Sequence, residues 1–454
     1  MRKFRTLLGA TLAGACALAV VPGTASAAPA VTPQAMAELA DTTGAYYPVS
    51  PARLMDTRSG LGAPKAKIGP GGKVDLQVTG RGGVPTSGVG AVVLNVTIAG
   101  PTADSFVTAY PAGEARPDAS SVNFAKGWLG SNNVTVKIGS GGKVSVYNRN
   151  GYTDVVVDVV GFYAKDNTMV NRNGGQYEWY PPSRVFDTRT EPEGKPAAGT
   201  TLEYALEFED AGQHAHIKSF VLNLTAVAPA SSGFLTAWSG AGSRPVSSTV
   251  NYGAGVNVPN LAFVQTTPCL ATDGWCTPGA PKFKIYTHAA AHVLVDFVGV
   301  VDDGYSEYGL RFKPMSPTRI VDSRTNLGIS GALGAGAIRS VTPPGGMLTE
   351  TTEVLAMNLT AVKPTNNTVL TVWQDDPEYP KPSTSNLNPY ANQVVSNAVP
   401  AVIYPYDAFN VHNHSGSTHV VADVVGTFYA LNPPAASALA AKPTKAQVTG
   451  SSHR

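Results

Sequence analysis

The chain has 454 residues, of which 43% are hydrophobic and only 14% are charged, so it can bury the cores of several domains. Its formal net charge of +2 gives no electrostatic reason to expect nucleic acid or an acidic membrane surface as a partner. The 47 glycines and 35 prolines are typical of many short strands joined by turns.

A secretory signal peptide is predicted at residues 1–27. A positively charged start precedes an apolar stretch, which closes on the small-residue cleavage sequence Ala25-Ser-Ala27. The apolar stretch is too short to span a bilayer. We therefore expect a secreted protein without a membrane span, mature from about Ala28, with a leader over residues 28–45.

Three segments of the chain then repeat the same landmarks in the same order. Each opens on Pro-x-Arg-φ-x-Asp-[Thr/Ser]-Arg and continues with a Leu-Asn-Val-Thr-like element, a further polar element and a second Asn. Each closes on a Val-rich run with one acid and a glycine. The openings are residues 51–58, 182–189 and 317–324, the first asparagines are Asn95, Asn223 and Asn358, and the second are Asn133, Asn260 and Asn397. The period of roughly 125–135 residues is domain-sized.

The repeats predict three all-β domains, at residues 46–164, 178–301 and 309–430, with a disordered tail over 431–454. Apolar and polar residues alternate between Gly-rich breaks, and about eight strands fit into the first repeat. Eight antiparallel strands favour a two-sheet sandwich of jelly-roll or Greek-key type. The alternative is a β-propeller in which each repeat forms two blades. Residues 139–142, Gly-Ser-Gly-Gly, are predicted to form a hairpin turn.

Four charged positions recur in every repeat. An ionised carboxylate within a Val-rich strand is costly unless it is paired, and the planar arginine side chain suits paired contact with a carboxylate. We interpret the set as a neutral ion network that holds the first strand of each repeat to the last; a ligand site repeated three times is the alternative. The residues are Arg53, Asp56, Arg58 and Asp158, then Arg184, Asp187, Arg189 and Asp296, then Arg319, Asp322, Arg324 and Asp423.

Cys269 and Cys276 close a small loop between two prolines, and in an exported protein this spacing predicts a disulfide. Five histidines flank the turn before the closing strand in the second and third repeats: His288, His292, His412, His414 and His419. Histidine pairs across strands can bind zinc or copper, but such sites usually need three or four ligands. We therefore predict no metal and no cofactor.

One strand position carries an aromatic residue in every repeat, just before a variable loop: Tyr110, Trp238 and Trp373. Aromatic rings beside polar loops can stack on sugar rings, although packing in the core is the commoner reason for them. These three residues are candidates for contact with a glycan.

The repeats resemble a domain family common in exported actinobacterial proteins, with the opening P-x-R-L-L-D-T-R, a central L-N-V-T and the closing A-D-V-V-G-Y-Y. The second repeat departs from this pattern, because Val300 replaces the closing aromatic residue and the cysteine loop is inserted. The resemblance implies an accessory module found alone, in tandem or beside secreted hydrolases, and it supplies no established activity to carry over to this chain.

No Gly-x-Ser-x-Gly, His-Glu-x-x-His or P-loop sequence is present. The function we predict is therefore non-catalytic: a secreted, cell-wall-associated protein that binds or coats an extracellular surface, glycan or protein, with tandem copies adding avidity. The alternatives are a secreted inhibitor or modulator of an extracellular enzyme, acting through a loop such as 268–278, and an unrecognised hydrolase.

Overall fold

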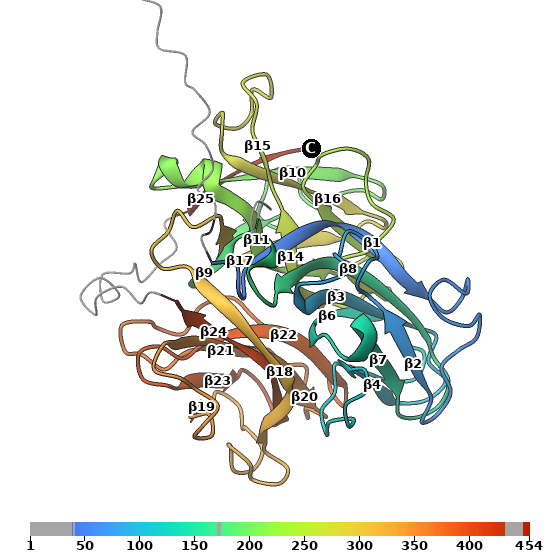
Figure 1. The fold of residues 1–454 in the computed structure, drawn as a ribbon. Coiled ribbons are helices and arrows are strands. Elements are labelled where there is room, and N and C mark those ends of the chain that lie inside the picture. Colours follow the sequence, from blue (N-terminus) through green and yellow to red (C-terminus); the bar gives the residue numbers. More distant parts are fainter. Residues whose placement is uncertain (1–38, 40, 170–173, 432–447) are drawn as a thin grey trace, which may run out of the picture. The chain divides into compact units, whose positions relative to one another are not determined.

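The computed structural model describes residues 39, 41–169, 174–431 and 448–454, and Ala37–Arg454 form one compact unit (Figure 1). The predicted signal peptide lies outside the described residues. Within the described residues, no helix has both the length and the apolar character that crossing a bilayer requires.

Repeat 1 is a sandwich of two four-stranded antiparallel sheets. The inner sheet has the order β1-β8-β3-β6 and the outer sheet β2-β7-β4-β5, which is the jelly-roll arrangement. The strands are β1 (Tyr46–Asp56), β2 (Lys73–Gln77), β3 (Val89–Ala99), β4 (Ser105–Pro111), β5 (Val122–Phe124), β6 (Gly130–Lys137), β7 (Lys143–Asn148) and β8 (Asp154–Ala164), with the 3₁₀ turn η1 (Ser140–Gly142). The sandwich and its eight strands are as the sequence predicts.

Repeat 2 has the same order, with inner sheet β9-β17-β11-β14 and outer sheet β10-β16-β12-β13. Its elements are β9 (Gln176–Asp187), β10 (Thr201–Phe208), β11 (Ile217–Val227), β12 (Gly233–Trp238), β13 (Val250–Tyr252), β14 (Val258–Gln265), β15 (Thr267–Pro268), β16 (Pro281–Thr287) and β17 (His292–Asp302). The 3₁₀ turns η2 (Asn167–Met169) and η3 (Ala211–His216) lie before β9 and β11.

Repeat 3 has inner sheet β18-β24-β20-β22 and outer sheet β19-β23-β21. A single bridge, Leu370 to Leu387, stands where the fifth strand lies in the other repeats. Its strands are β18 (Leu310–Asp322), β19 (Ile338–Val341), β20 (Thr352–Val362), β21 (Leu370–Gln374), β22 (Val394–Val402), β23 (Phe409–Asn413) and β24 (His419–Ala430). Pairing of Tyr177 with Leu310 joins the inner sheets of repeats 2 and 3.

Three expectations are corrected. The propeller alternative is wrong, because each described repeat is two stacked sheets. Residues 139–142 do not form a hairpin turn, because they connect β6 and β7, which belong to different sheets. The tail is not disordered throughout: β25 (Val448–His453) pairs with the free edge of β10, seen as a red strand beside a green one in Figure 1. Residues 432–447 lie outside the described part of the chain.

Each sandwich has its own apolar core between its sheets, and a fourth cluster is shared by all three repeats. In the shared cluster the ring of Tyr163, in repeat 1, lies 4.2 Å from that of Phe312, in repeat 3. The ring centroid of Tyr46, at the start of repeat 1, lies 4.9 Å from that of Phe263 in repeat 2. Burial of these faces against each other explains why the repeats form one unit.

Each closing strand contains a glycine at a point where a larger side chain would clash with an aromatic residue. A Cβ atom at Gly161 would lie 2.2 Å from the hydroxyl of Tyr46, and one at Gly426 would lie 2.3 Å from the ring of Phe312. The opening strand thus places an aromatic ring directly over the closing strand, and only glycine leaves room for it.

Candidate functional site

The motif arginine of each repeat pairs with the aspartate of the closing strand through two nitrogens. Arg53 Nε and Nη2 lie 2.9 and 3.3 Å from the two carboxylate oxygens of Asp158. The same contacts are 2.8 and 3.1 Å for Arg184 with Asp296, and 2.8 and 3.2 Å for Arg319 with Asp423. Burial raises the pKa of each aspartate, and the neighbouring guanidinium opposes that rise.

In each repeat, the other arginine and aspartate of the charged set form a second pair, which lies nearer the surface. Arg58 donates Nε and Nη2 to Asp56 at 2.9 and 2.8 Å, and these hydrogen bonds hold the pKa of Asp56 below its usual range. The Arg58 side chain is 51% exposed, so the set is only partly buried. Arg189 with Asp187 and Arg324 with Asp322 repeat this geometry.

The polar set also contacts the next repeat, which sequence reasoning missed. At the junction of repeats 1 and 2, Arg53 Nη2 donates to the carbonyl of Val246 at 3.3 Å and Asn95 donates to that of Ser248 at 2.6 Å. At the junction of repeats 3 and 1, the backbone N–H of Ser120 donates to Asp423 at 3.2 Å. The set therefore holds both the strands of one repeat and the loop of its neighbour.

A cycle of asparagines joins the three repeats. Asn260 accepts from the backbone N–H of Asn133 at 2.8 Å and donates to the Asn95 side chain at 2.9 Å. Asn397 makes the same two contacts with Leu261 N–H and Asn223, and Asn132 makes them with Ala398 N–H and Asn358. The counterpart of Asn260 and Asn397 is thus Asn132, and the sequence alignment on Asn133 was wrong by one residue.

The junction of repeats 2 and 3 differs from the other two. Asn223 still donates to a loop carbonyl, that of Ser385, at 2.7 Å. The loop is two residues longer, however: 373 to 386 spans the same landmarks as 110 to 121 and 238 to 249. A cleft of about 450 Å³ lies at this junction, beside Arg184. The junction of repeats 3 and 1 has a cavity of about 40 Å³ against Asp423 and Ser120, and a second pocket of about 610 Å³ lies between Phe106 and Lys363.

Aromatic and proline side chains make up much of the wall of this junction cleft. Trp179 is fixed by a hydrogen bond from Nε1 to Glu353 at 2.9 Å and by edge contact with Tyr379, whose ring centroid lies 5.9 Å away. The polar members come from both repeats. The aromatic and polar residues of the lining are Tyr177, Trp179, Tyr180, Trp373, Tyr379, Ser183, Arg184, Asn223, Gln374, Lys381, Ser383 and Asn386.

The three candidate aromatic residues are all buried. Tyr110, Trp238 and Trp373 are 5%, 7% and 8% exposed. Trp373 lines the junction cleft, so it has a cavity that a ligand could enter. Tyr110 belongs to the same position of repeat 1, where the loop is shorter. The signal that sequence reasoning lacked was this difference in loop length between otherwise equivalent junctions.

Two of the five candidate histidines form hydrogen bonds with hydroxyl groups, and the other three contact other rings. His292 Nδ1 lies 3.2 Å from the hydroxyl of Thr188, and His419 Nδ1 lies 2.9 Å from that of Ser323. His292 and His419 occupy the position of Asp154 in repeat 1, where Asp154 accepts a hydrogen bond from the hydroxyl of Thr57. His288 stacks on Phe234, and the rings of His412 and His414 lie 6.3 Å apart.

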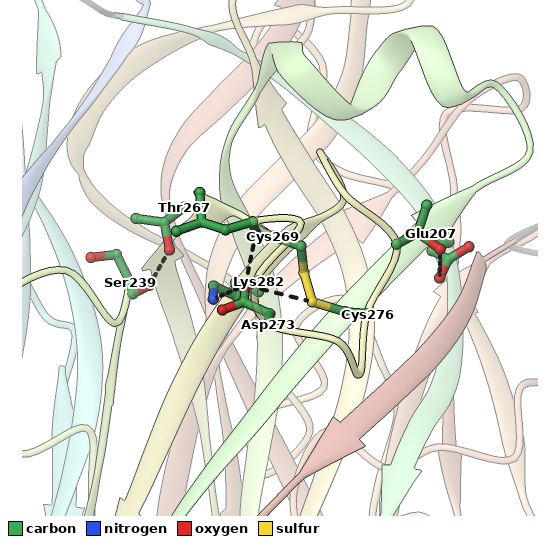
Figure 2. Close-up of a disulfide and its surroundings, with 9 residues drawn as sticks. Glu207, Ser239, Thr267, Cys269, Asp273, Cys276 and Lys282 are labelled. Atoms are coloured by element: carbon green, nitrogen blue, oxygen red, sulfur yellow. Dashed lines mark hydrogen bonds and ion pairs between the residues drawn. A yellow bond between two sulfur atoms is a disulfide. The ribbon is translucent and has the colours of Figure 1, made fainter.

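The predicted disulfide is present, with Cα atoms of Cys269 and Cys276 6.2 Å apart (Figure 2). The carboxylate of Asp273, within the loop, forms an ion pair with Lys282 of β16. Among the described residues, one group of three candidate metal ligands comes together, Cys269, Asp273 and Cys276. Both sulfurs are used in the disulfide, so this group cannot supply thiolates.

The chain was compared with protein families, curated proteins and solved structures. No family model and no curated protein matches the chain. A protein with a triple jelly-roll fold from the turret assembly of an archaeal virus shares 9% identity, covers 87% of this chain and 98% of its own, and has a TM-score of 0.16. A protein of Sulfolobus turreted icosahedral virus shares 10% identity over 80% of this chain and 85% of its own, with a TM-score of 0.15.

Proposed function

We propose that this protein is an extracellular, non-catalytic binder of a cell-wall polysaccharide, and that the junction cleft holds a segment of the polymer. The observation that carries the proposal is the cleft lined by five aromatic side chains at the junction of repeats 2 and 3. Its volume of about 450 Å³ lies within the range of ligand pockets in proteins, roughly 300–1,000 Å³.

The chemistry of the cleft suits a neutral sugar. The C–H faces of a sugar ring pack against the electron-rich face of an aromatic ring, which Trp373 or Tyr180 can supply. Amide and hydroxyl side chains such as Asn223 and Ser383 can both donate to and accept from sugar hydroxyls. The charge of Arg184 is matched by its contact with Asp296, and Lys381 is the other cationic side chain of the lining.

The same lining supports binding without hydrolysis. Glycoside hydrolysis uses two carboxyl groups that flank the scissile bond. Among the described residues, none of those that line the junction cleft is an aspartate, glutamate, histidine or cysteine. The cationic groups Arg184 and Lys381 cannot act as the required acid and base pair.

An extracellular location is supported by the disulfide, which persists in oxidising compartments, and by the signal peptide predicted at residues 1–27. Sequencing of the protein from the culture medium should find a chain that begins near Ala28 and has no free thiol. Retention of residues 1–27 in the external protein, or a labelled thiol at Cys269, would argue against this location.

The proposal is tested by retention of the full-length protein on immobilised cell-wall polysaccharides, with Trp373→Leu compared against Trp238→Leu. The two tryptophans occupy equivalent strand positions and are 8% and 7% exposed, so Trp238→Leu is the control for the loss of a buried indole ring. We expect Trp373→Leu to lose at least tenfold in affinity and Trp238→Leu to bind as the wild type does.

Equal affinity of the two variants would contradict the cleft as the site. Binding to a protein partner that is lost on reduction of the Cys269–Cys276 bridge would instead support the inhibitor alternative. Turnover of the polysaccharide by purified protein would contradict the non-catalytic proposal.

A further inference from the structure

The outer sheet of repeat 2 carries a strand that the corresponding edges β2 and β19 do not have among the described residues. β25 pairs antiparallel with β10, from Phe208 opposite Val448 to Glu203 opposite His453. Val448 packs against the core of repeat 2. A Cβ atom at Gly450 would lie 2.5 Å from the ring of Phe186, so the segment fits only with glycine at that position.

The last two residues of the segment, His453 and Arg454, contact three further groups of repeat 2. Arg454 donates to Glu191 at 3.2 Å and to the carbonyl of Gly194 at 2.7 Å. Burial raises the pKa of Glu191, and the hydrogen bond and charge of Arg454 oppose that rise. The ring of His453 stacks on Trp275 of the disulfide loop at 5.7 Å.

These features belong to repeat 2 alone. Glu191 follows the motif aspartate by four residues, where repeat 1 has Gly60 and repeat 3 has Asn326. Trp275 lies in the inserted loop between the cysteines. The edge of β10, with Phe186, Glu191 and Trp275, is therefore a specific receptor for one short sequence, and we call it the strand site.

We propose that the strand site binds Val448–Arg454 of a second copy of the chain, so that two copies exchange their last strands and associate. A second copy carries the matching sequence, and exchange of an identical segment reproduces every contact seen within one copy. Sixteen residues lie between Leu431 and Val448 in the sequence.

The charge pair at the end of the segment allows a test with two full-length variants. Glu191→Arg places two cations together when a chain binds its own segment, and Arg454→Glu places two anions together. In a mixture of the two variants, each segment meets an opposite charge only on the other chain. We expect each variant alone to be monomeric, and an equimolar mixture to form a one-to-one heterodimer, measured by native mass spectrometry and light scattering.

A synthetic peptide of residues 446–454 should dissociate this heterodimer, whereas the same peptide with Gly450→Val should not. In wild-type protein the fraction of dimer should rise with concentration and fall when the peptide is added. The proposal is overturned if the mixture stays monomeric while both variants keep the wild-type melting temperature. It is also overturned if the two peptides act equally. Should either variant unfold, the wild-type protein and the two peptides still decide the question.

Discussion

The side-chain amide of Asn132 donates to the side-chain oxygen of Asn358 at 2.8 Å, across 226 residues of sequence. Asn132 lies in repeat 1 and Asn358 in repeat 3. The same contact joins repeat 2 to repeat 1 and repeat 3 to repeat 2, so each repeat is bonded to both others. The asparagines that mark the repeats are therefore the residues that assemble them.

The cycle predicts a large cost for removing one member. Asn260→Ala removes the partner of the Asn133 backbone N–H and of the Asn95 side-chain oxygen, and it leaves the carbonyl of Thr249 with only its hydrogen bond from the Ser131 hydroxyl. We expect the free energy of unfolding to fall by about 2–4 kcal/mol, because unpaired buried polar groups are costly. Chemical denaturation of the full-length protein measures it. The exposed Asn150→Ala is the control and should change stability by less than about 0.5 kcal/mol; an equally small change for Asn260→Ala would contradict the role of the cycle.

Asp158 supports both its own repeat and a junction. Asp158→Ala leaves Arg53 without its main partner at a site where the aspartate is fully buried. We expect a loss of roughly 3–5 kcal/mol, the usual cost of removing one member of a buried ion pair. Calorimetry of the full chain should show one transition at lower temperature. A fully stable variant that has lost polysaccharide binding would instead make the charged set a ligand site.

The stability of the protein should fall between about pH 4 and pH 7 because of Asp302. Burial, with a contribution from Glu178, raises the pKa of Asp302 from 3.8 to about 7. In this interval the folded chain holds a proton that the unfolded chain has released, so stability decreases as pH rises. A shift of about three pH units corresponds to at most about 4 kcal/mol.

The backbone N–H groups of Gly304 and Ser306 donate to the two carboxylate oxygens of Asp302 at 2.8 and 3.0 Å. Asp302→Asn cannot titrate, and it keeps one oxygen for one of these two N–H groups. Denaturation across this pH range should show a shallower decline for Asp302→Asn than for the wild type. The exposed Glu307→Gln should leave the decline unchanged. If the wild type and Asp302→Asn have the same pH profile, Asp302 does not titrate in this interval.

Much of the sandwich could be predicted from local sequence. Strand alternation and Gly-rich breaks placed the eight strands of repeat 1, and the need to neutralise Asp158 identified a charged set that includes Arg53, its partner in the structure. The contacts between repeats could not be predicted in this way. They join residues more than 100 positions apart, and nothing local to Asn95 indicates that its partner is Ser248.

The last strand and the junction cleft show two further limits. The composition after Leu431 indicates disorder, but Val448–His453 form a strand because β10 offers an unpaired edge. Trp373 could be singled out as an aromatic residue beside a loop. Trp373 lines the junction cleft, whereas Trp238 occupies the equivalent strand position in repeat 2. This difference depends on two extra residues in the loop after Trp373 and on the neighbouring repeat that this loop faces.

The central claim is that one junction out of three binds the polysaccharide, and the stoichiometry of binding tests it most directly. A soluble fragment of the retained polysaccharide is titrated into the full-length protein in a calorimeter. We predict one site per chain, with the site lost in Trp373→Leu and kept in Trp238→Leu. Three equal sites per chain, or one site that survives Trp373→Leu unchanged, would contradict the account.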